Sequence, residues 1–420
     1  MKFFFPDSQD LVDPSFDFTT ERRAADRVRH RDDVYAHELF SRPAYDGLLV
    51  SKGIVDGFGP GSGRYTLAQR HRLLRVGVRE FFRLNENMAP LPVIGDCGAF
   101  TYVREKTPPY TVDEVIDFYR ECRFDYGISV DHIILAFQPG WDAVESAVPD
   151  EVRERQEITL ELAAEFLVRH RATRSAFMPI GVAQGWSPRS YAHSVEILQR
   201  MGYDYIALGG MVPLKSREIL ECLKAIDAVR LPTTRLHLLG VTRVDRVTTF
   251  ESHGVASFDS TSPLLQAFKD DKDNYYTMDR TYTAIRVPQV EGNPSLQKRI
   301  KAGLISQDRA RALERACLAS LAQYAAGTVD IENVLGFLSE YEALYDPEKD
   351  HSAAYRETLA DRPWTHCACD VCRAIGYHVA VFRGAERNRR RGLHNVWVFY
   401  RRLGRAFGLD HDSQMTALLA

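Results

Sequence analysis

Short apolar runs alternate with longer segments of helical periodicity from the N-terminus to about residue 260. Segments such as 151–170 and 216–229 place apolar residues three or four positions apart, as amphipathic helices do. Eight intervening runs have the length and composition of strands: Met1–Phe5, Gly47–Val50, Pro92–Gly95, His132–Phe137, Ala176–Val182, Tyr205–Ala207, Arg235–Leu239 and Val255–Phe258. This alternation is typical of parallel sheets, and eight units predict an α/β fold of the (β/α)8 TIM-barrel type.

Two regions depart from the alternation. The stretch from about 6 to 46 is long, polar and charged, and we expect it to form helices inserted after the first strand. Beyond residue 290 the pattern is helical, with amphipathic periodicity at 307–324 and 331–344. The predicted organisation is a barrel domain over 1–290 that carries this insertion, followed by a helical C-terminal subdomain over 291–420.

Composition indicates a globular protein with a large core and excludes some other classes of protein. Hydrophobic residues make up 45% of the 420 residues, which predicts a large core. No run of about 18 apolar residues is present, and the apolar start is too short for a signal peptide, so we expect a cytoplasmic protein without membrane contact. The net charge of -3 argues against a polycation that binds nucleic acid indiscriminately.

One segment is nevertheless strongly basic. From 383 to 405 the chain has eight arginines and a single acid, Glu386. Such a patch can neutralise phosphates, and we expect four of these side chains to contact nucleic acid: Arg387, Arg389, Arg390 and Arg391. The alternative is a solvated charge run at the end of a helix.

Three of the seven cysteines crowd into Cys367-Ala-Cys369-Asp-Val-Cys372. Three thiolates on one turn and a distant imidazole make a closed tetrahedral set, which suits a structural Zn2+ that folds the segment and performs no chemistry. The alternative is a cluster of free thiols without metal. The residues alone leave three histidines open as the fourth ligand: His366, His378 and His394.

Polar residues and glycines follow the predicted strands at their carboxyl ends, which line the active site in (β/α)8 enzymes. Asp96 follows the third strand and Asp259 follows the eighth. Other such positions follow the fourth to seventh strands: Gln138, Gln184, Gly185, Gly209, Gly210 and Gly240. Each has a structural alternative, since aspartates cap helices and Gly-Gly forms turns, but together they predict one pocket.

These runs resemble the tRNA-guanine transglycosylases. The matching runs occur in the family's order from about residue 90 to 400: Gly95-Asp96-Cys-Gly-Ala-Phe100, Phe177-Met-Pro-Ile-Gly-Val-Ala-Gln184-Gly185, Ala207-Leu-Gly209-Gly210, Leu239-Gly240-Val241, Gly254-Val-Ala-Ser-Phe258-Asp259, and the three cysteines with Leu393-His394-Asn395. The resemblance implies a (β/α)8 barrel with a C-terminal zinc-binding subdomain. It also favours His394 as the fourth ligand.

The resemblance also implies roles for single residues. Asp259 would be the nucleophile that attacks C1′ of the target nucleoside and forms a covalent aspartyl–sugar intermediate. Asp96 would be the acid and base that serves the leaving and incoming bases. A nucleotide flipped into the pocket would meet the following substrate-binding residues: Phe100, Gln138, Gln184, Gly185, Gly209, Gly210, Leu239 and Gly240. Phe100 and Leu239 would sandwich the base.

Two departures from the tRNA enzymes bear on the substrate. Where they carry a third aspartate after Ala-Phe, this chain has Gln138, which cannot offer two acceptors to guanine, so Asp131 or another group would compensate. Asp259 is followed by Ser-Thr-Ser-Pro instead of Pro-Thr-Arg. With the opening Met1-Lys-Phe-Phe-Phe-Pro-Asp-Ser8, these departures resemble the DpdA branch, which inserts 7-cyano-7-deazaguanine into DNA in restriction–modification systems.

The resulting hypothesis is a pentosyltransferase that exchanges guanine in DNA for a 7-deazaguanine and carries a structural Zn2+. The resemblance also implies an ATPase partner protein, which no residue of this chain indicates by itself. Two alternatives stay open. One is a tRNA-guanine transglycosylase of the queuosine or archaeosine type, and the other is a non-catalytic subunit that binds nucleic acid.

Overall fold

The computed structural model forms two compact units, which we describe separately. Among the residues that the structure describes, the barrel unit consists of those in 1–9, 45–261 and 403–409, and the helical unit of those in 10–44 and 262–402. The structure describes the following residues of the chain: 1–58, 64–84, 91–144, 147–269 and 272–409.

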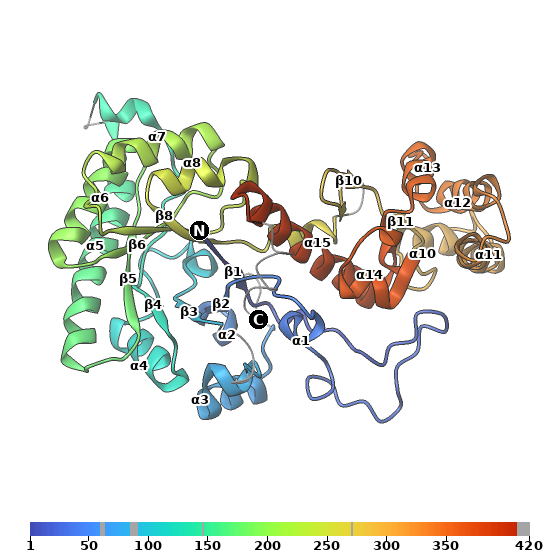
Figure 1. Ribbon diagram of the computed structural model, residues 1–420, viewed down its shortest axis with the longest axis horizontal. Helices are drawn as coiled ribbons and strands as arrows, with labels where there is room; N and C mark the ends of the chain where they lie inside the picture. Colours follow the sequence, from blue (N-terminus) through green and yellow to red (C-terminus); the bar gives the residue numbers. More distant parts are fainter. Residues whose placement is uncertain (59–63, 85–90, 145–146, 270–271, 410–420) are drawn as a thin grey trace. The chain divides into compact units, whose positions relative to one another are not determined.

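The barrel unit is built on eight parallel strands that close in sequence order, with β8 paired to β1. The strands are β1 (Lys2–Pro6), β2 (Gly47–Ser51), β3 (Val93–Asp96), β4 (Tyr126–Ile128), β5 (Met178–Ala183), β6 (Tyr205–Leu208), β7 (Arg235–Leu238) and β8 (Val255–Asp259). Figure 1 shows helices on the outside of these strands: α2 (Lys52–Asp56), α3 (Leu67–Phe81), α4 (Val112–Cys122), α5 (Asp150–Ala172), α6 (Pro188–Met201), α7 (Ser216–Asp227) and α8 (Val247–Ser252). The predicted (β/α)8 barrel is confirmed.

The barrel interior follows the two-residue period of its strands. Its core contains one or two buried side chains from most strands: Phe4, Leu49, Ile94, Ile128, Ile180, Val182, Tyr205 and Ala207. Because alternate side chains of a strand point to the same face, the residue two positions beyond a core residue also points inward. This continuation brings polar side chains to the carboxyl end of the barrel, for example Asp96 after Ile94 and Gln184 after Val182.

The fourth strand does not lie where the sequence predicted it. The run His132–Phe137 forms no strand, and Tyr126–Ile128 pairs with β3 and β5 in its place. The run is apolar because Ile133 and Ile134 are buried, but side chains satisfy its backbone. Thr159 Oγ1 accepts from the N–H of His132 at 2.9 Å, and Gln184 Oε1 accepts from that of Ile134 at 3.1 Å. The other seven strands agree with the prediction to within two residues at each end.

The insertion expected at about 6–46 contains one four-residue helix, α1 (Ala36–Leu39), in place of the several helices expected. Two isolated bridges, Val12 to Val34 and Asp17 to Arg22, and a series of turns make up most of the rest. Short polar side chains satisfy the backbone of these turns, as where Asp17 Oδ1 accepts from the N–H of Thr19 at 2.7 Å. Such local bonds compete with helix formation, which explains the difference.

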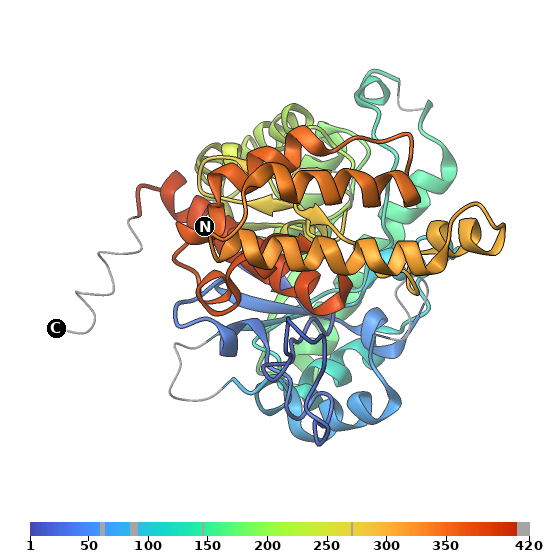
Figure 2. The ribbon, with the colours of Figure 1, turned by 90° about the vertical axis from the view of Figure 1, so that its right-hand side faces the viewer.

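The helical unit contains the two amphipathic helices expected near 307–324 and 331–344, now bounded as α11 (Gln307–Ala325) and α12 (Ile331–Tyr345). They pack side by side (Figure 2). Besides α1 and two 3-10 helices, Pro363–Thr365 and Gly376–Ala380, the unit contains α9 (Ser262–Gln266), β9 (Tyr275–Tyr276), β10 (Thr281–Tyr282), β11 (Ile285–Arg286), α10 (Pro294–Lys301), α13 (Ser352–Asp361), α14 (Asp370–Ile375), β12 (Val381–Phe382) and most of α15 (Gly384–Ala406). Within the described ranges, none of the helices has the length and apolar character needed to span a membrane.

Candidate active site and metal-binding cluster

Three carboxyl groups meet at the carboxyl end of the barrel. Asp96 is the last residue of β3, Asp259 is the last residue of β8, and Asp131 lies three residues beyond β4. Burial, together with the nearby charges of Asp131 and Asp259, raises the pKa of the half-buried Asp96 to about 7. Burial also raises the pKa of Asp131 to about 6. The two aspartates singled out from the sequence therefore lie at one mouth of the barrel, with a third beside them.

Asp259 is held by two donors on one of its oxygens. Its Oδ1 accepts from the Nε2–H of His237 at 3.1 Å and from the backbone N–H of Gly240 at 3.0 Å. Gly240 has a φ of +72°, and a Cβ at this position would lie 2.6 Å from Val212. Only glycine can therefore present this N–H to the carboxylate without strain.

Asp131 is held by a thiol and an amide. The Cys97 S–H donates to Asp131 Oδ1 at 3.1 Å, and Nε2 of Gln184 donates to Oδ2 at 2.7 Å. The Tyr102 hydroxyl in turn donates to Cys97 Sγ at 3.0 Å. Gln184 is only 1% exposed, and its amide oxygen accepts from the N–H of Ile134. Both ends of the amide are therefore hydrogen-bonded, one to Ile134 and the other to Asp131.

The glycines after β5 and β6 are explained by close packing around Gln184. A Cβ on Gly209 would overlap the Gln184 amide, and one on Gly210 would overlap the carbonyl of Ile134. Gly210 also has a φ of +71°, which favours glycine. A Cβ on Gly185 would lie 2.8 Å from Ser190 Oγ. Gly209 and Gly210 therefore let the backbone approach the amide that supports Asp131, whereas Gly185 lets it approach Ser190.

Two apolar side chains predicted to sandwich a base lie in different surroundings. Phe100 follows Asp96 on the short 3-10 helix Ala99–Tyr102 and is 50% exposed, so its ring is free to stack. Leu239 is half-buried at the end of β7 and packs against the barrel core.

Gln138 does not occupy the position that the sequence suggested. It is exposed at the start of the 3-10 helix Pro139–Asp142, and its backbone N–H donates to the carbonyl of Trp186 at 2.7 Å. Because β4 ends at Ile128, the carboxyl group that follows this strand belongs to Asp131. The expectation that Gln138 directly follows the fourth strand is corrected, since it came from placing that strand too late in the chain.

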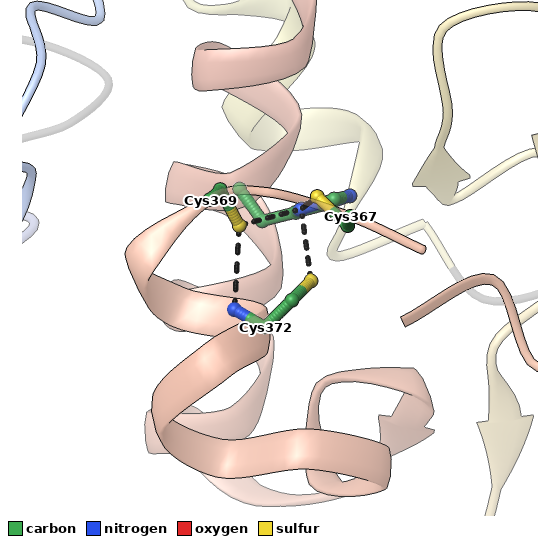
Figure 3. A group of neighbouring side chains, drawn as sticks. Cys367, Cys369 and Cys372 are labelled. Atoms are coloured by element: carbon green, nitrogen blue, oxygen red, sulfur yellow. Dashed lines mark hydrogen bonds between the residues drawn. The ribbon is translucent and has the colours of Figure 1, made fainter. Parts of the chain in front are cut away.

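The Cys3His cluster lies in the helical unit. The ligand atoms of its four members all lie within 4.8 Å of one another: Cys367, Cys369, Cys372 and His394. Figure 3 shows the three cysteines close together. Nδ1 of His394 lies 3.3 Å from the Sγ atoms of Cys369 and Cys372. The Nε2–H of His394 donates to the carbonyl of Tyr276 at 2.7 Å, which leaves Nδ1 as the ligand atom. The group could hold a metal ion.

Neighbouring residues fix the orientation of this cluster. The Tyr275 ring stacks on His394 with centroids 4.5 Å apart, and its hydroxyl lies 3.3 Å from Cys372 Sγ. Asn395 Oδ1 accepts from the N–H of Tyr276 at 2.9 Å. The rival histidine His378 stacks on Phe18, with centroids 5.4 Å apart. Supporting bonds of this kind are typical of metal sites that are preformed by the fold.

The arginine segment does not form the surface expected from its charge. Arg387, Arg390 and Arg391 are 3%, 4% and 0% exposed. Arg387 pairs with Glu21, and Arg391 donates to the carbonyl of Ala267 at 2.7 Å. Buried guanidinium groups cannot reach phosphates, so the prediction is wrong for these three.

The acids that pair with this segment are distant in sequence, and this explains the error. Glu21, which pairs with Arg383 and Arg387, lies more than 360 residues earlier in the chain. A count of charges along 383–405 could not reveal this partner. Arg389 is the partly exposed member, with 26% of its side chain exposed.

A cavity of 1210 Å³ lies at the opposite end of the barrel, where Lys2, Met178 and Asp204 mark the beginnings of strands. Its cations, among them Arg123 and Arg174, follow the C-terminal ends of α4 and α5. Helix dipoles favour cations at these positions, so their presence needs no ligand. The carboxyl groups of the mouth therefore remain the better candidate for chemistry.

No family model matches the chain. A DNA-guanine transglycosylase from Salmonella montevideo is 52% identical to it over 418 residues, which cover 99% of each protein. The chain therefore belongs to the guanine transglycosylase family, whose members are pentosyltransferase enzymes.

Proposed function

We propose that this protein exchanges guanine in DNA for a 7-deazaguanine base through a covalent aspartyl–sugar intermediate. The observation that carries the proposal is the convergence of Asp96, Asp131 and Asp259 at the carboxyl end of the barrel. The choice of DNA rests on the relative, which is described as a DNA-guanine transglycosylase. The family resemblance suggests 7-cyano-7-deazaguanine as the incoming base.

In the first half-reaction, Asp259 attacks C1′ of the target nucleoside. The new O–C1′ bond forms as the bond from C1′ to guanine breaks, and its electron pair goes to the base. Asp96 supplies the proton that lets guanine leave as a neutral molecule, and a pKa of about 7 suits it to this task near neutral pH. The sugar is left as an ester of Asp259.

In the second half-reaction, the ionised Asp96 takes the proton from the ring nitrogen of the incoming base. That nitrogen attacks C1′ and displaces Asp259, which returns to a carboxylate. Two inversions at C1′ restore the original configuration. Because the ester conserves the energy of the glycosidic bond, the exchange consumes no ATP.

Asp131 is proposed to recognise the base. Its carboxylate presents two oxygens, which match the N1–H and N2–H2 donors on one edge of guanine. A 7-deazaguanine has the same edge, so one carboxylate would bind both the leaving and the incoming base. The exposed ring of Phe100 would stack on the face of the base, with Leu239 on the other face.

The target nucleotide must leave the duplex to react. Asp131 and Asp259 are only 2% and 7% exposed, so a base that remains stacked in DNA cannot reach them. Enzymes with recessed sites solve this problem by flipping the nucleotide out of the helix. A reaction on DNA would place the enzyme in the cytoplasm, and the resemblance leads us to expect an ATPase partner in a restriction–modification setting.

The metal is proposed to be a structural Zn2+. Three thiolates and one imidazole would fill its tetrahedral shell, leaving no position for substrate: Cys367, Cys369, Cys372 and His394. When bound, the ion would stabilise the fold around α14 and α15. It would take no part in the exchange.

The proposed function is tested by mass spectrometry of hydrolysed DNA and tRNA from cells with and without the gene. The purified protein is also incubated with labelled guanine and either duplex DNA or tRNA. We expect label in DNA, a 7-deazaguanine in cellular DNA, and a protein–DNA adduct that survives denaturation. Loss of the modified base from tRNA alone would favour the tRNA enzyme, and no exchange with either polymer would favour a non-catalytic subunit.

A further inference from the structure

A line of buried polar side chains runs along the inside of the barrel to Asp259. The Tyr205 hydroxyl is hydrogen-bonded to Ser257 Oγ. Ser257 Oγ lies 2.6 Å from Nδ1 of His237, and Nε2 of His237 lies 3.1 Å from Asp259 Oδ1. Tyr205, Ser257 and His237 are 4%, 1% and 0% exposed. Each polar group in the line therefore relies on its neighbours, and not on solvent, for hydrogen bonds.

The line depends on an irregularity in the barrel. β7 and β8 pair Leu236 with Val255 but His237 with Ser257, so Ala256 is an extra residue in β8. Without this bulge His237 would lie opposite Ala256, because a shift of one residue turns every following side chain to the other face. Bulges that re-aim a side chain are common beside active sites.

With a neutral His237, the hydrogen bonds of the line have one consistent direction. A carboxylate can only accept, so Nε2 of His237 carries the proton, and Nδ1 of the neutral imidazole is then an acceptor. Ser257 must then donate to Nδ1, which leaves its oxygen to accept from Tyr205. Burial raises the pKa of Tyr205, which keeps its hydroxyl protonated as this arrangement requires.

The line acts on one oxygen of the nucleophile. Oδ1 of Asp259 accepts from both His237 and Gly240, whereas no hydrogen bond to Oδ2 is made within the described ranges of the chain. Two donors on one oxygen fix the plane of the carboxylate. The second oxygen is then presented with its lone pairs unshared.

We propose that His237 is a positioning residue, locked in its Nε2–H form by Ser257 and Tyr205, and that it selects Oδ2 of Asp259 as the attacking atom. This inference rests on the proposed function of Asp259. In the ester, Oδ1 is the carbonyl oxygen and still accepts from His237 and Gly240. When the incoming base displaces Asp259, the same two donors receive the returning negative charge, so the line serves both half-reactions.

The kinetic test uses the full-length protein with its metal and measures adduct formation on DNA in a single turnover. His237→Phe removes the donor, and we expect the rate to fall about 10- to 100-fold, the usual worth of a hydrogen bond to a charged group, with DNA affinity unchanged. His237→Gln restores an N–H donor and should recover part of the rate. Its recovery separates positioning from a packing defect.

A matched pair of tyrosines tests the far end of the line. Tyr205→Phe should slow adduct formation about 2- to 10-fold, as expected for one neutral hydrogen bond. Tyr203→Phe removes an equally buried phenol two residues away, whose hydroxyl donates to the carbonyl of Ala163 at 2.7 Å. It should leave the rate unchanged.

A spectroscopic test does not depend on activity. Proton–nitrogen NMR of protein labelled on its histidine rings should show His237 protonated at Nε2, and Ser257→Ala should weaken that preference. A proton on Nδ1 in the wild type, or an unchanged rate in folded His237→Phe, would overturn the inference. A wild type that forms no adduct, or an active Asp259→Ala variant, would instead overturn the proposed function. The NMR experiment would still show which nitrogen of His237 carries the proton.

Discussion

The mouth of the barrel and the Cys3His cluster are assembled in opposite ways. Three of the four cluster ligands lie between Cys367 and Cys372, so one turn of chain brings them together. The carboxyl groups of the mouth come from β3, the segment after β4, and β8, which span more than 160 residues from Asp96 to Asp259. The cluster can therefore stabilise its own segment, whereas the mouth depends on a barrel that is already folded. Loss of a ligand should damage structure, and loss of the Asp259 carboxyl group should damage chemistry alone.

The largest effect is expected from removing the metal. His394→Ala should lose bound Zn2+ and destabilise the helical unit, since structural zinc contributes on the order of 10 kcal/mol to small zinc-binding folds. Metal content by mass spectrometry and thermal unfolding measure this. The matched control is His378→Ala, which should keep the metal. Retention of zinc by His394→Ala would refute the ligand assignment.

A smaller free-energy change, with no structural damage, is expected at the nucleophile. Asp259→Ala should lower the rate of base exchange by at least about 10^4-fold, which corresponds to about 5.5 kcal/mol. Metal content and unfolding temperature should stay at wild-type values. Asp117→Asn, which removes a carboxyl group that is 61% exposed on α4, is the control and should remain active. Loss of zinc from the Asp259 variant would break the contrast between the two regions.

The buried arginines extend the contrast to α15. Arg391→Ala should lower the free energy of unfolding by about 2–4 kcal/mol, because it leaves several buried carbonyls without a donor. Arg389→Ala, at a partly exposed site, should cost at most about 0.5 kcal/mol. Denaturant titration measures both. A weaker salt dependence of DNA binding in folded Arg391→Ala would restore this residue as a phosphate contact.

The smallest effect, measured per unit of pH, is a pH dependence of stability that belongs to the mouth. Asp96 has a pKa raised from 3.8 to about 7, so the folded protein retains a proton that the unfolded chain loses. Its contribution to stability is complete below pH 3.8 and is lost as the pH rises to about 7. Across that window this contribution of Asp96 to the free energy of unfolding changes by at most about 1.4 kcal/mol per pH unit.

Asp96→Asn should flatten this part of the stability curve, as measured by denaturant midpoints at several pH values. Asp131, whose pKa is raised from 3.8 to about 6, should maintain a smaller slope of the same sign. Release of guanine in a single turnover should also slow as the pH rises through about 7, because Asp96 is then ionised. Parallel stability curves for the wild type and Asp96→Asn would show that Asp96 is not buried as described.

The sequence by itself determined the (β/α)8 barrel, seven of its eight strands, and the members of the Cys3His cluster apart from the choice of histidine. These features depend on short-range patterns, namely the alternation of strands and helices and the spacing of thiols along one turn. Asp96 and Asp259 could also be singled out, because each follows directly on an apolar strand whose end the sequence marks well.

Only the tertiary structure decided which fourth strand enters the barrel, and with it that Asp131, and not Gln138, follows closely on that strand. A short apolar run has the same appearance whether it pairs in a sheet or is buried beyond one. Tertiary structure also decided that Arg387 meets Glu21 in the interior, and that a bulge aims His237 at Asp259. The physical reason is the same in each case: the partners are distant in sequence, and a pattern along the chain carries no record of contacts made across it.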